Sequence, residues 1–553
     1  MTATASATSS MPLRNLLLLL PASVAAHGSC GHDATAKWSG GVRNLGYSFN
    51  KAVPYASKPS RGRQTSSNEF VPIRISLDFS AGATGMTAEK QSFLQNTLLP
   101  DAIEWIQASL SVVPVTGTLK YARTCRVFQG GTCHTEGPAP TCGASTSGGD
   151  YAVPSALLDS LETCATCFTG PTPCTGCSTT PAGAGALAAD FVLFVSSVAT
   201  SSCSSSTIAY ASTCQRDQND RPIFGMANFC PAMLSTAAAD YASMRATAIH
   251  EVLHALGFSS GSWPLFRQPD GTPMTARELD GLPATTSATC ADGSTRSNVL
   301  EVSSSTLQVA SGRGGATIVR LVTPRVASVA RDVFGCATLT GAELENQPTG
   351  SGCYGSHWEQ RNWLNELMAA VSSHAAVYSA LTLAALHDSG WYVANYSATG
   401  PLLWGRSKGC SFINDPCVSS SGAHQPGFCS TPGEEGCTPD FLAKGHCHVA
   451  TYSADLPAPF RYFADPRTGG ASQTADFCPY FAAYSNGACS ATVNAPSANY
   501  RAETFGSGAR CFSTSLSQVA YPQPQGPKTF PNPAPTQRPP HPTPAQAHAL
   551  WPL

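Results

Sequence analysis

The sequence predicts an α+β fold with a small, disulfide-rich domain near its C-terminal end. Apolar residues alternate with others over 71–79, which predicts a strand with one buried face. The apolar run at 191–195 predicts a second, fully buried strand. An apolar stripe at helical spacing predicts a helix over 237–256. Eight cysteines among glycines and prolines between 400 and 511 indicate the stapled domain.

The composition excludes several classes of protein. The chain has 553 residues, a formal net charge of -2 and only 12% charged residues, whereas 42% are hydrophobic. A chain of this length usually forms two to four domains. The lack of a basic excess argues against nucleic acid or anionic membranes as main partners. A wholly disordered or fibrous protein is also excluded.

The cysteines and the N-terminus indicate the compartment. Twenty-two cysteines are typical of a disulfide framework formed in an oxidising compartment. Arg14 precedes the leucine run 16–20, and small residues follow at 24–26, as in a secretory signal peptide. The run is too short to span a bilayer, and no other segment approaches transmembrane length. We therefore expect a secreted protein, and the sequence leaves open whether it attaches to a cell surface.

Further local signals complete the expected secondary structure. Thr87 is placed to cap a helix that Pro100 interrupts or ends, and a second helical stretch follows over 103–110. Residues 125–188 form a Cys-, Gly-, Pro- and Thr-rich insertion. The Ser/Thr/Gly-rich segment 260–320 is expected to loop over the surface, and helical patterns return over 358–386.

These signals suggest a division of the chain into six parts. In chain order they are a signal peptide (1–26), a polar segment (27–66), an N-terminal subdomain (67–257), a second subdomain (258–399), a Cys-rich C-terminal domain (400–515) and a Pro-rich, disordered tail (516–553). Eleven prolines after Tyr521 underlie the last assignment.

The segment that carries chemistry is His250-Glu251-Val252-Leu253-His254. Positions i and i+4 share one face of a helix, so both imidazoles can bind one Zn²⁺. Glu251 lies one position further and is poorly placed as a ligand. It can instead act as a general base toward a water molecule that the metal activates. The alternative is a helix with two incidental histidines.

Two histidines leave a catalytic zinc site one protein ligand short. In the compact form of the motif a glycine follows the second histidine by three residues, and a third histidine follows three residues later. Gly257 is present and would end the helix, but Ser260 occupies the expected ligand position. The ligand must then come from further along the chain, and the candidates are His357, His374, His387 and the carboxylate of Glu278.

Three motifs together resemble the leishmanolysin family of metzincin zinc proteases. They are His-Glu-Val-Leu-His-Ala-Leu-Gly-Phe at 250–258, Gly-Ser-His-Trp at 355–358 and Asn-Glu-Leu-Met at 365–368. The resemblance spans about 70–420 and weakens through the C-terminal domain. The insertion at 125–188 and the Pro-rich tail depart from it.

The resemblance implies a complete active site. It makes His250, His254 and His357 the ligands of one Zn²⁺, Glu251 the general base, and Met368 the Met-turn residue beneath the metal. It also implies a mixed, twisted sheet above the active-site helix, with a lower edge strand near 208–210 that binds an extended substrate by strand addition.

Cys30 lies in His27-Gly28-Ser29-Cys30-Gly31-His32-Asp33, which is similar to the family's propeptide cysteine motif. The resemblance therefore implies that 27–66 is a propeptide and that 67–257 and 258–399 are the two catalytic subdomains. A thiolate can occupy the open position on zinc and keep the enzyme latent. The alternative is that Cys30 is a disulfide partner. If Cys30 is free, 21 cysteines remain, so one further thiol must be unpaired.

Two other motifs have simpler interpretations. Cys164, Cys167, Cys174 and Cys177 form two C-x-x-C pairs, for which disulfides are favoured over a zinc ribbon. Asn395-Tyr396-Ser397 is an acceptor sequence for N-glycosylation.

The sequence thus predicts a secreted zinc metalloendopeptidase that is made as a latent proenzyme and cleaves protein or peptide substrates. The alternative from another class is an adhesion or binding module on an inactive protease scaffold. A missing ligand or base would favour that alternative, but all are present.

Overall fold

The computed structural model describes the chain in separate ranges. They are 48–50, 53–55, 70–129, 132–143, 151–166, 174–204, 206–347, 353–371, 376–495, 503–514 and 547–552. The predicted signal peptide, Cys30, His374 and most of the predicted tail lie outside these residues.

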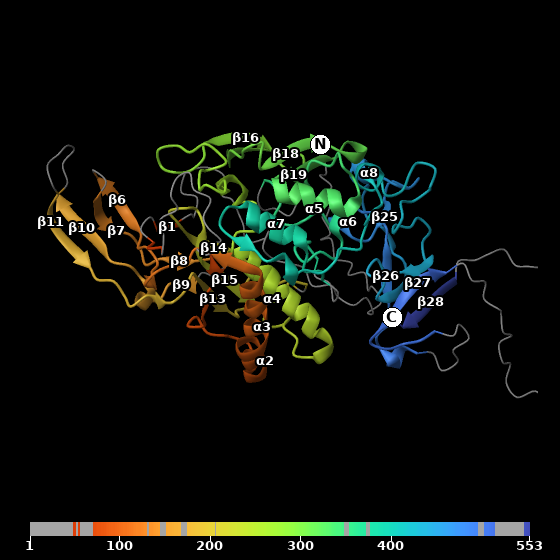
Figure 1. Cartoon of the computed structure of the whole chain (residues 1–553), viewed down its shortest axis with the longest axis horizontal. Coiled ribbons are helices and arrows are strands. Elements are labelled where there is room, and N and C mark those ends of the chain that lie inside the picture. Colours follow the sequence, from red (N-terminus) through yellow and green to blue (C-terminus); the bar gives the residue numbers. More distant parts are fainter. Residues whose placement is uncertain are drawn as a thin grey trace, which may run out of the picture.

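A five-stranded mixed sheet forms the centre of the N-terminal half (Figure 1). Strand β13 is parallel to both of its neighbours, β15 and β3, whereas β14 is antiparallel to β15. All six residues of β13 are buried, as its continuous apolar run predicts. The strands in spatial order are β1 (Ser48–Asn50), β14 (Ala209–Asp217), β15 (Pro222–Phe229), β13 (Phe191–Ser196) and β3 (Ile75–Asp78).

The helix capped by Thr87 forms as predicted. Thr87 Oγ1 accepts a hydrogen bond from the Lys90 N–H, at the start of α2 (Ala88–Phe93). A π-helical turn (Leu94–Leu98) connects α2 to α3 (Leu99–Ser109). Pro100 is the second residue of α3, directly after this turn. The proline thus follows an irregular turn and does not end the helical path.

The helix predicted over 237–256 is α4 (Tyr241–Ala255), preceded by a short 3₁₀ turn (Ala238–Asp240). Gly257 ends it with φ 110°, and a Cβ there would lie 2.9 Å from the Trp391 ring. A glycine is therefore required both by the backbone angle and by the close packing. Thr213 Oγ1 of β14 donates to the Ala255 carbonyl, which ties α4 to the sheet.

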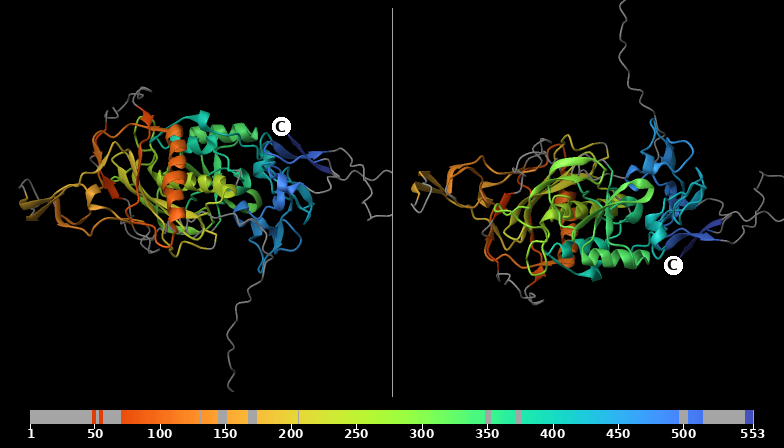
Figure 2. Two further views of the ribbon diagram at one scale, coloured as in Figure 1. Left: turned by 90° about the horizontal axis from the view of Figure 1, so that it is seen from below. Right: turned by 90° about the horizontal axis from the view of Figure 1, so that it is seen from above.

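The insertion at 125–188 forms a separate four-stranded sheet that projects from one end of the molecule (Figures 1 and 2). The disulfides Cys125–Cys133 and Cys164–Cys177 each join two of its strands. In spatial order the strands are β11 (Thr175–Thr180), β10 (Leu161–Thr166), β7 (Thr132–Glu136) and β6 (Cys125–Gln129).

The expectation of surface loops over 260–320 was wrong. This segment contains the hairpin β16 (Thr285–Thr289) and β17 (Thr295–Leu300). It also contains β18 (Leu307–Ser311) and β19 (Thr317–Leu321), which form a sheet with β20 (Ala342–Leu344). In β16 the alternate residues Thr285, Ser287 and Thr289 lie on an exposed face, where polar side chains are tolerated.

The helical pattern over 358–386 is only partly realised. It yields a single turn, α6 (Gln360–Trp363), and later α7 (Ala380–Asp388). The described residues between them form tight turns around Met368. Leu364 leaves the helical conformation with φ 18°, so the apolar spacing reflects burial in turns there. A further helix, α5 (Pro324–Phe334), contacts α7.

Short strands complete this half of the molecule. They are β2 (Val71–Pro72), β4 (Leu110–Val112), β5 (Thr118–Leu119), β8 (Thr141–Cys142), β9 (Tyr151–Ala152), β12 (Ala186–Leu187) and β21 (Val393–Ala394). Within the described ranges no helix has both the length and the apolar character needed to cross a membrane.

The C-terminal domain is built from short elements and disulfides, at the opposite end from the projecting sheet (Figure 2). Its bridges are Cys417–Cys478, Cys429–Cys447 and Cys437–Cys511. Its elements are α8 (Cys410–Asn414), β22 (Glu435–Cys437), β23 (Ala443–Cys447), β24 (Val449–Thr451), β25 (Thr468–Gly470), β26 (Phe481–Ala488), β27 (Ala509–Thr514) and β28 (Ala547–Pro552).

Strand β28 differs from the expected disordered tail, because residues 547–552 pair with β27. Their sequence is Ala-His-Ala-Leu-Trp-Pro, in which the only proline is the last residue. A ladder of N–H donors can therefore form up to that point.

Nine disulfides connect described cysteines, and the unpaired thiol among them is the buried Cys489. Burial raises the pKa of Cys489 to about 11, so this thiol is protonated and unreactive at neutral pH. If Cys30 is free, the other 21 cysteines must include one more unpaired thiol, and Cys489 can be that thiol. The role of Cys30 itself stays a prediction.

Candidate metal centre

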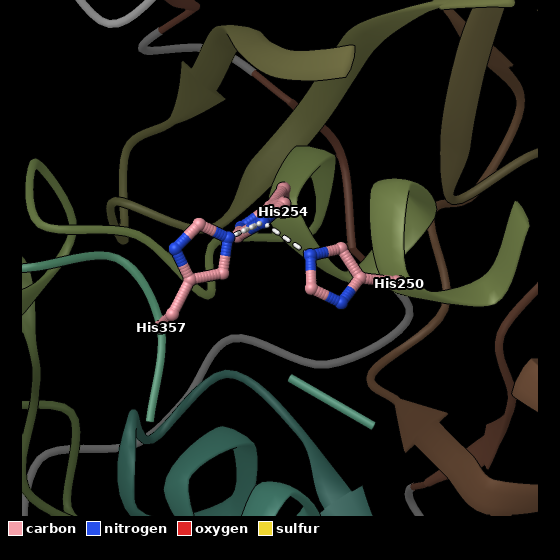
Figure 3. A group of neighbouring side chains, drawn as sticks. All are labelled: His250, His254 and His357. Atoms are coloured by element: carbon pink, nitrogen blue, oxygen red, sulfur yellow. Dashed lines mark hydrogen bonds between the residues drawn. The ribbon is translucent and has the colours of Figure 1, made fainter. Parts of the chain in front are cut away.

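The structure brings three predicted site residues to one point in the interior. His250 and His254 project from α4, and His357 reaches them from a loop 103 residues beyond His254 (Figure 3). The Nε2 atom of His254 lies 3.0 Å from that of His250 and 3.2 Å from that of His357. All three side chains are buried.

The path of the chain explains how a distant histidine occupies this position. The Ser260 N–H donates to Ser356 Oγ, and the Trp263 indole N–H donates to the Gly355 carbonyl. The chain therefore leaves the end of α4 near Ser260 and returns beside the same point just before His357. Gly355 has φ 74°, and a Cβ there would lie 2.6 Å from the Glu345 carbonyl oxygen, so the return turn requires glycine.

Backbone carbonyls orient the two helix histidines. The Nδ1–H of His250 donates to the Leu367 carbonyl at 2.6 Å, and the Nδ1–H of His254 donates to the Phe258 carbonyl at 2.6 Å. A ring proton on Nδ1 leaves Nε2 as the basic nitrogen. Each of these Nε2 lone pairs then points toward the common centre.

The donor set fits a zinc ion. Two nitrogens bound about 2.0 Å from one tetrahedral Zn²⁺ lie about 3.3 Å apart, which is close to the observed separations. Without a cation, basic nitrogens at this distance repel each other. Imidazole nitrogen is a preferred zinc ligand, and three such ligands leave one position open for water or substrate.

Glu251 lies on the same helical turn as His250 and is fully buried. Its position in the motif places it beside the face of α4 that carries the two histidines, but it is not a member of the histidine group. A carboxylate there is suited to exchange protons with a water molecule at the centre.

The other third-ligand candidates within the described residues lie elsewhere. Glu278 is exposed, in a turn closed by its N–H bond to the Leu282 carbonyl. His387 is in α7, where Tyr396 contacts its Nδ1 and burial lowers its pKa. Neither belongs to the histidine group.

Met368 is fully buried in the turn that supports the site, and an acidic residue that the sequence analysis did not single out organises this turn. The Glu366 carboxylate accepts hydrogen bonds from the Met368 N–H at 2.5 Å, the Thr382 hydroxyl at 2.6 Å and the Ser379 hydroxyl at 2.5 Å. Leu367, between the two, supplies the carbonyl that orients His250. The only feature of the sequence that could have drawn attention to Glu366 was its place in the motif Asn-Glu-Leu-Met.

Glu366 gives the fold a predictable pH dependence. Burial raises its pKa from the ordinary 4.5 to about 7, although its hydrogen bonds oppose the shift. Because the folded-state pKa is the higher one, its stabilising effect is complete below about pH 4.5 and is lost as the pH rises through 7. At about 1.4 kcal/mol per pKa unit, we expect a loss of about 3 kcal/mol.

Urea unfolding of the metal-free protein at pH 5 and pH 8 measures this effect. The Glu366→Gln variant carries a neutral side chain at both pH values, so its loss of stability between them should be smaller than that of the parent. An equal loss in both proteins would show that Glu366 does not titrate in this range.

Two further predicted features have defined positions. Asn395 is exposed, and its Nδ2 donates to the Ala108 carbonyl, so its glycosylation stays a prediction. Cys164 is bonded to Cys177, and Cys174 is also in a disulfide. These three cysteines are therefore not ligands of a zinc ribbon.

Comparison with known proteins points in the same direction as this geometry. The family profile described as leishmanolysin matches residues 165–529. The chain is 33% identical to a leishmanolysin-like peptidase of Drosophila melanogaster, over 81% of this chain and 70% of that protein. It is 32% identical to a leishmanolysin-like peptidase of Caenorhabditis elegans (80% and 72%) and 32% identical to a leishmanolysin homolog of Crithidia fasciculata (77% and 52%).

Proposed function

Because the chain belongs to the leishmanolysin family of metallopeptidases, we propose that it is a zinc-dependent endopeptidase whose ligands are His250, His254 and His357. The observation that carries this proposal is the convergence of their three Nε2 atoms, with backbone carbonyls fixing the tautomers of two. Zn²⁺ bound there would polarise the scissile carbonyl and lower the pKa of a water molecule to about 7.

The protein's own groups then carry out the proton transfers. Glu251 takes a proton from the attacking water as the new C–O bond forms at the scissile carbonyl. It delivers that proton to the amine nitrogen as the C–N bond breaks. Glu251 is buried directly beside His250 on α4, so its carboxylate lies next to the proposed metal site.

We place the substrate along β14. This strand is antiparallel to β15 and lies against α4. An extended peptide that lies alongside this strand and bonds to it through main-chain hydrogen bonds would explain how one site accepts many sequences.

Secretion and latency are further parts of the proposal. The described disulfides fit an oxidising compartment. The N-terminal sequence supplies a signal peptide (1–26) and Cys30 as the latency thiol. Inside the proposed propeptide, residues 48–50 pair with β14, and the backbone of Val53 exchanges two hydrogen bonds with the Gln218 side chain. This segment is thus held against the catalytic part.

Removal of zinc tests the proposal. We expect the mature chain to cleave an unstructured protein such as casein, to lose this activity with a chelator and to recover it with stoichiometric zinc. Zinc at 100 times its dissociation constant should also stabilise the fold by about 2.7 kcal/mol, measurable as a rise in melting temperature. Activity that persists after zinc is shown to be removed would refute the proposed chemistry.

A further inference from the structure

We infer that the C-terminal domain holds the third ligand in place through residues 472–476, which contact the loop that carries His357. This inference rests on the proposed metal site. It assigns part of the metal affinity to residues remote in sequence from all three ligands.

The first contact is to Gln360, which follows His357 by three residues. Gln360 Oε1 accepts hydrogen bonds from the hydroxyls of Ser472, at 2.9 Å, and Thr474. Gln360 is buried at the start of α6, three residues after the ligand. Two hydroxyls of the C-terminal domain thus fix one amide of the ligand loop.

The second contact is a buried ionic network. The Asp476 carboxylate pairs with Arg313, whose other terminal nitrogen lies 2.6 Å from the Glu343 carboxylate. All three side chains are at most 2% exposed. Asp476 also accepts a hydrogen bond from Gln347 at 3.1 Å. Buried charges of this kind hold their partners in one arrangement, because any displacement leaves a charge unpaired in the interior.

Glu343 transmits this contact to the ligand. It belongs to β20, which runs along the ligand loop. The Glu359 N–H donates to the Glu343 carbonyl at 3.0 Å, and the Glu345 N–H donates to the His357 carbonyl at 2.9 Å. Backbone hydrogen bonds at His357 and Glu359 thus join the ligand loop to the segment 343–345. In the same segment, the Glu343 side chain pairs with Arg313, which also pairs with Asp476.

The segment is itself firmly held. The disulfide Cys417–Cys478 lies two residues beyond Asp476. Asp476 and Phe477 both have positive φ, 55° and 56°, a conformation that costs roughly 1–2 kcal/mol per residue. Phe477 packs with Leu456 and Phe460 around Ala316, a residue of the catalytic part. The local strain is thus offset by packing that spans the two parts of the molecule.

The test measures zinc affinity by competition with a chromophoric chelator on the full chain. We expect Asp476→Asn and Thr474→Val each to raise the zinc dissociation constant about tenfold, the lower end of the effect of removing groups that orient metal ligands. Thr474→Ser keeps the hydroxyl and should bind zinc like the parent. Proteolysis by the weakened variants should recover as zinc is raised, because the site is loosened and its chemistry is unchanged.

Glu503→Gln is the matched control. It removes the ion pair that the buried Glu503 forms with the partly exposed Lys444, at 2.8 Å, in the same domain but at the β22–β23 strand pair, outside residues 472–476. We expect it to lower the melting temperature and leave zinc affinity unchanged. Unchanged affinity in both Asp476→Asn and Thr474→Val, with zinc-binding parent protein, would overturn the inference. A parent that binds no zinc would instead overturn the proposed function.

Discussion

Glu251→Gln is expected to abolish proteolysis while zinc remains bound. General acid–base catalysis contributes about 10²- to 10⁴-fold to rate, so kcat/KM should fall by at least two orders of magnitude. The amide matches the carboxylate in shape but cannot accept the proton. Because Glu251 lies outside the histidine group, its loss leaves three ligands in place. Hydrolysis of casein and zinc content, measured on the same preparations of parent and variant, provide the test.

Two results would contradict this assignment. A variant that keeps more than a tenth of the parent's activity would show that another group is the base. A fully zinc-loaded, processed parent that cleaves nothing would favour the binding-module alternative for this chain. A similar melting temperature for parent and variant is the control for folding.

His357→Ala is expected to have the next largest effect, because it removes one of the three proposed ligands. We expect zinc affinity to fall by more than the roughly 100-fold upper value seen when only an orienting group is lost. Proteolysis should be lost at ordinary zinc concentrations. Equilibrium dialysis against buffered zinc measures the affinity directly.

Glu278→Ala is the matched control, because Glu278 is the carboxylate that the sequence offered as an alternative ligand. It is exposed in a surface turn, so its removal should leave affinity and activity unchanged. If His357→Ala keeps its zinc and Glu278→Ala loses it, the two-histidine, one-carboxylate site would be the correct one.

Local patterns predicted much of the fold. The α+β class, the buried strand at 191–195 and the active-site helix are confirmed, as is the family. The prediction was wrong where composition misled it. The Ser- and Thr-rich segment 260–320 forms antiparallel strands, and the apolar spacing over 358–386 partly belongs to buried turns. The composition of a segment indicates whether its residues are buried or exposed, whereas the pairing of strands depends on residues that are distant in the sequence.

The candidate metal centre also has some features that follow from local sequence and others that follow only from tertiary structure. The sequence by itself determined the pairing of His250 with His254 and the helix end at Gly257, because one helical turn and one backbone angle are local properties. Only the tertiary structure brought His357 to them, through a return turn beside Ser260 and pairing with β20. It also revealed the roles of Glu366 and Asp476. Their partners lie up to 163 residues away in the chain, and a contact over that distance depends on how the whole chain packs.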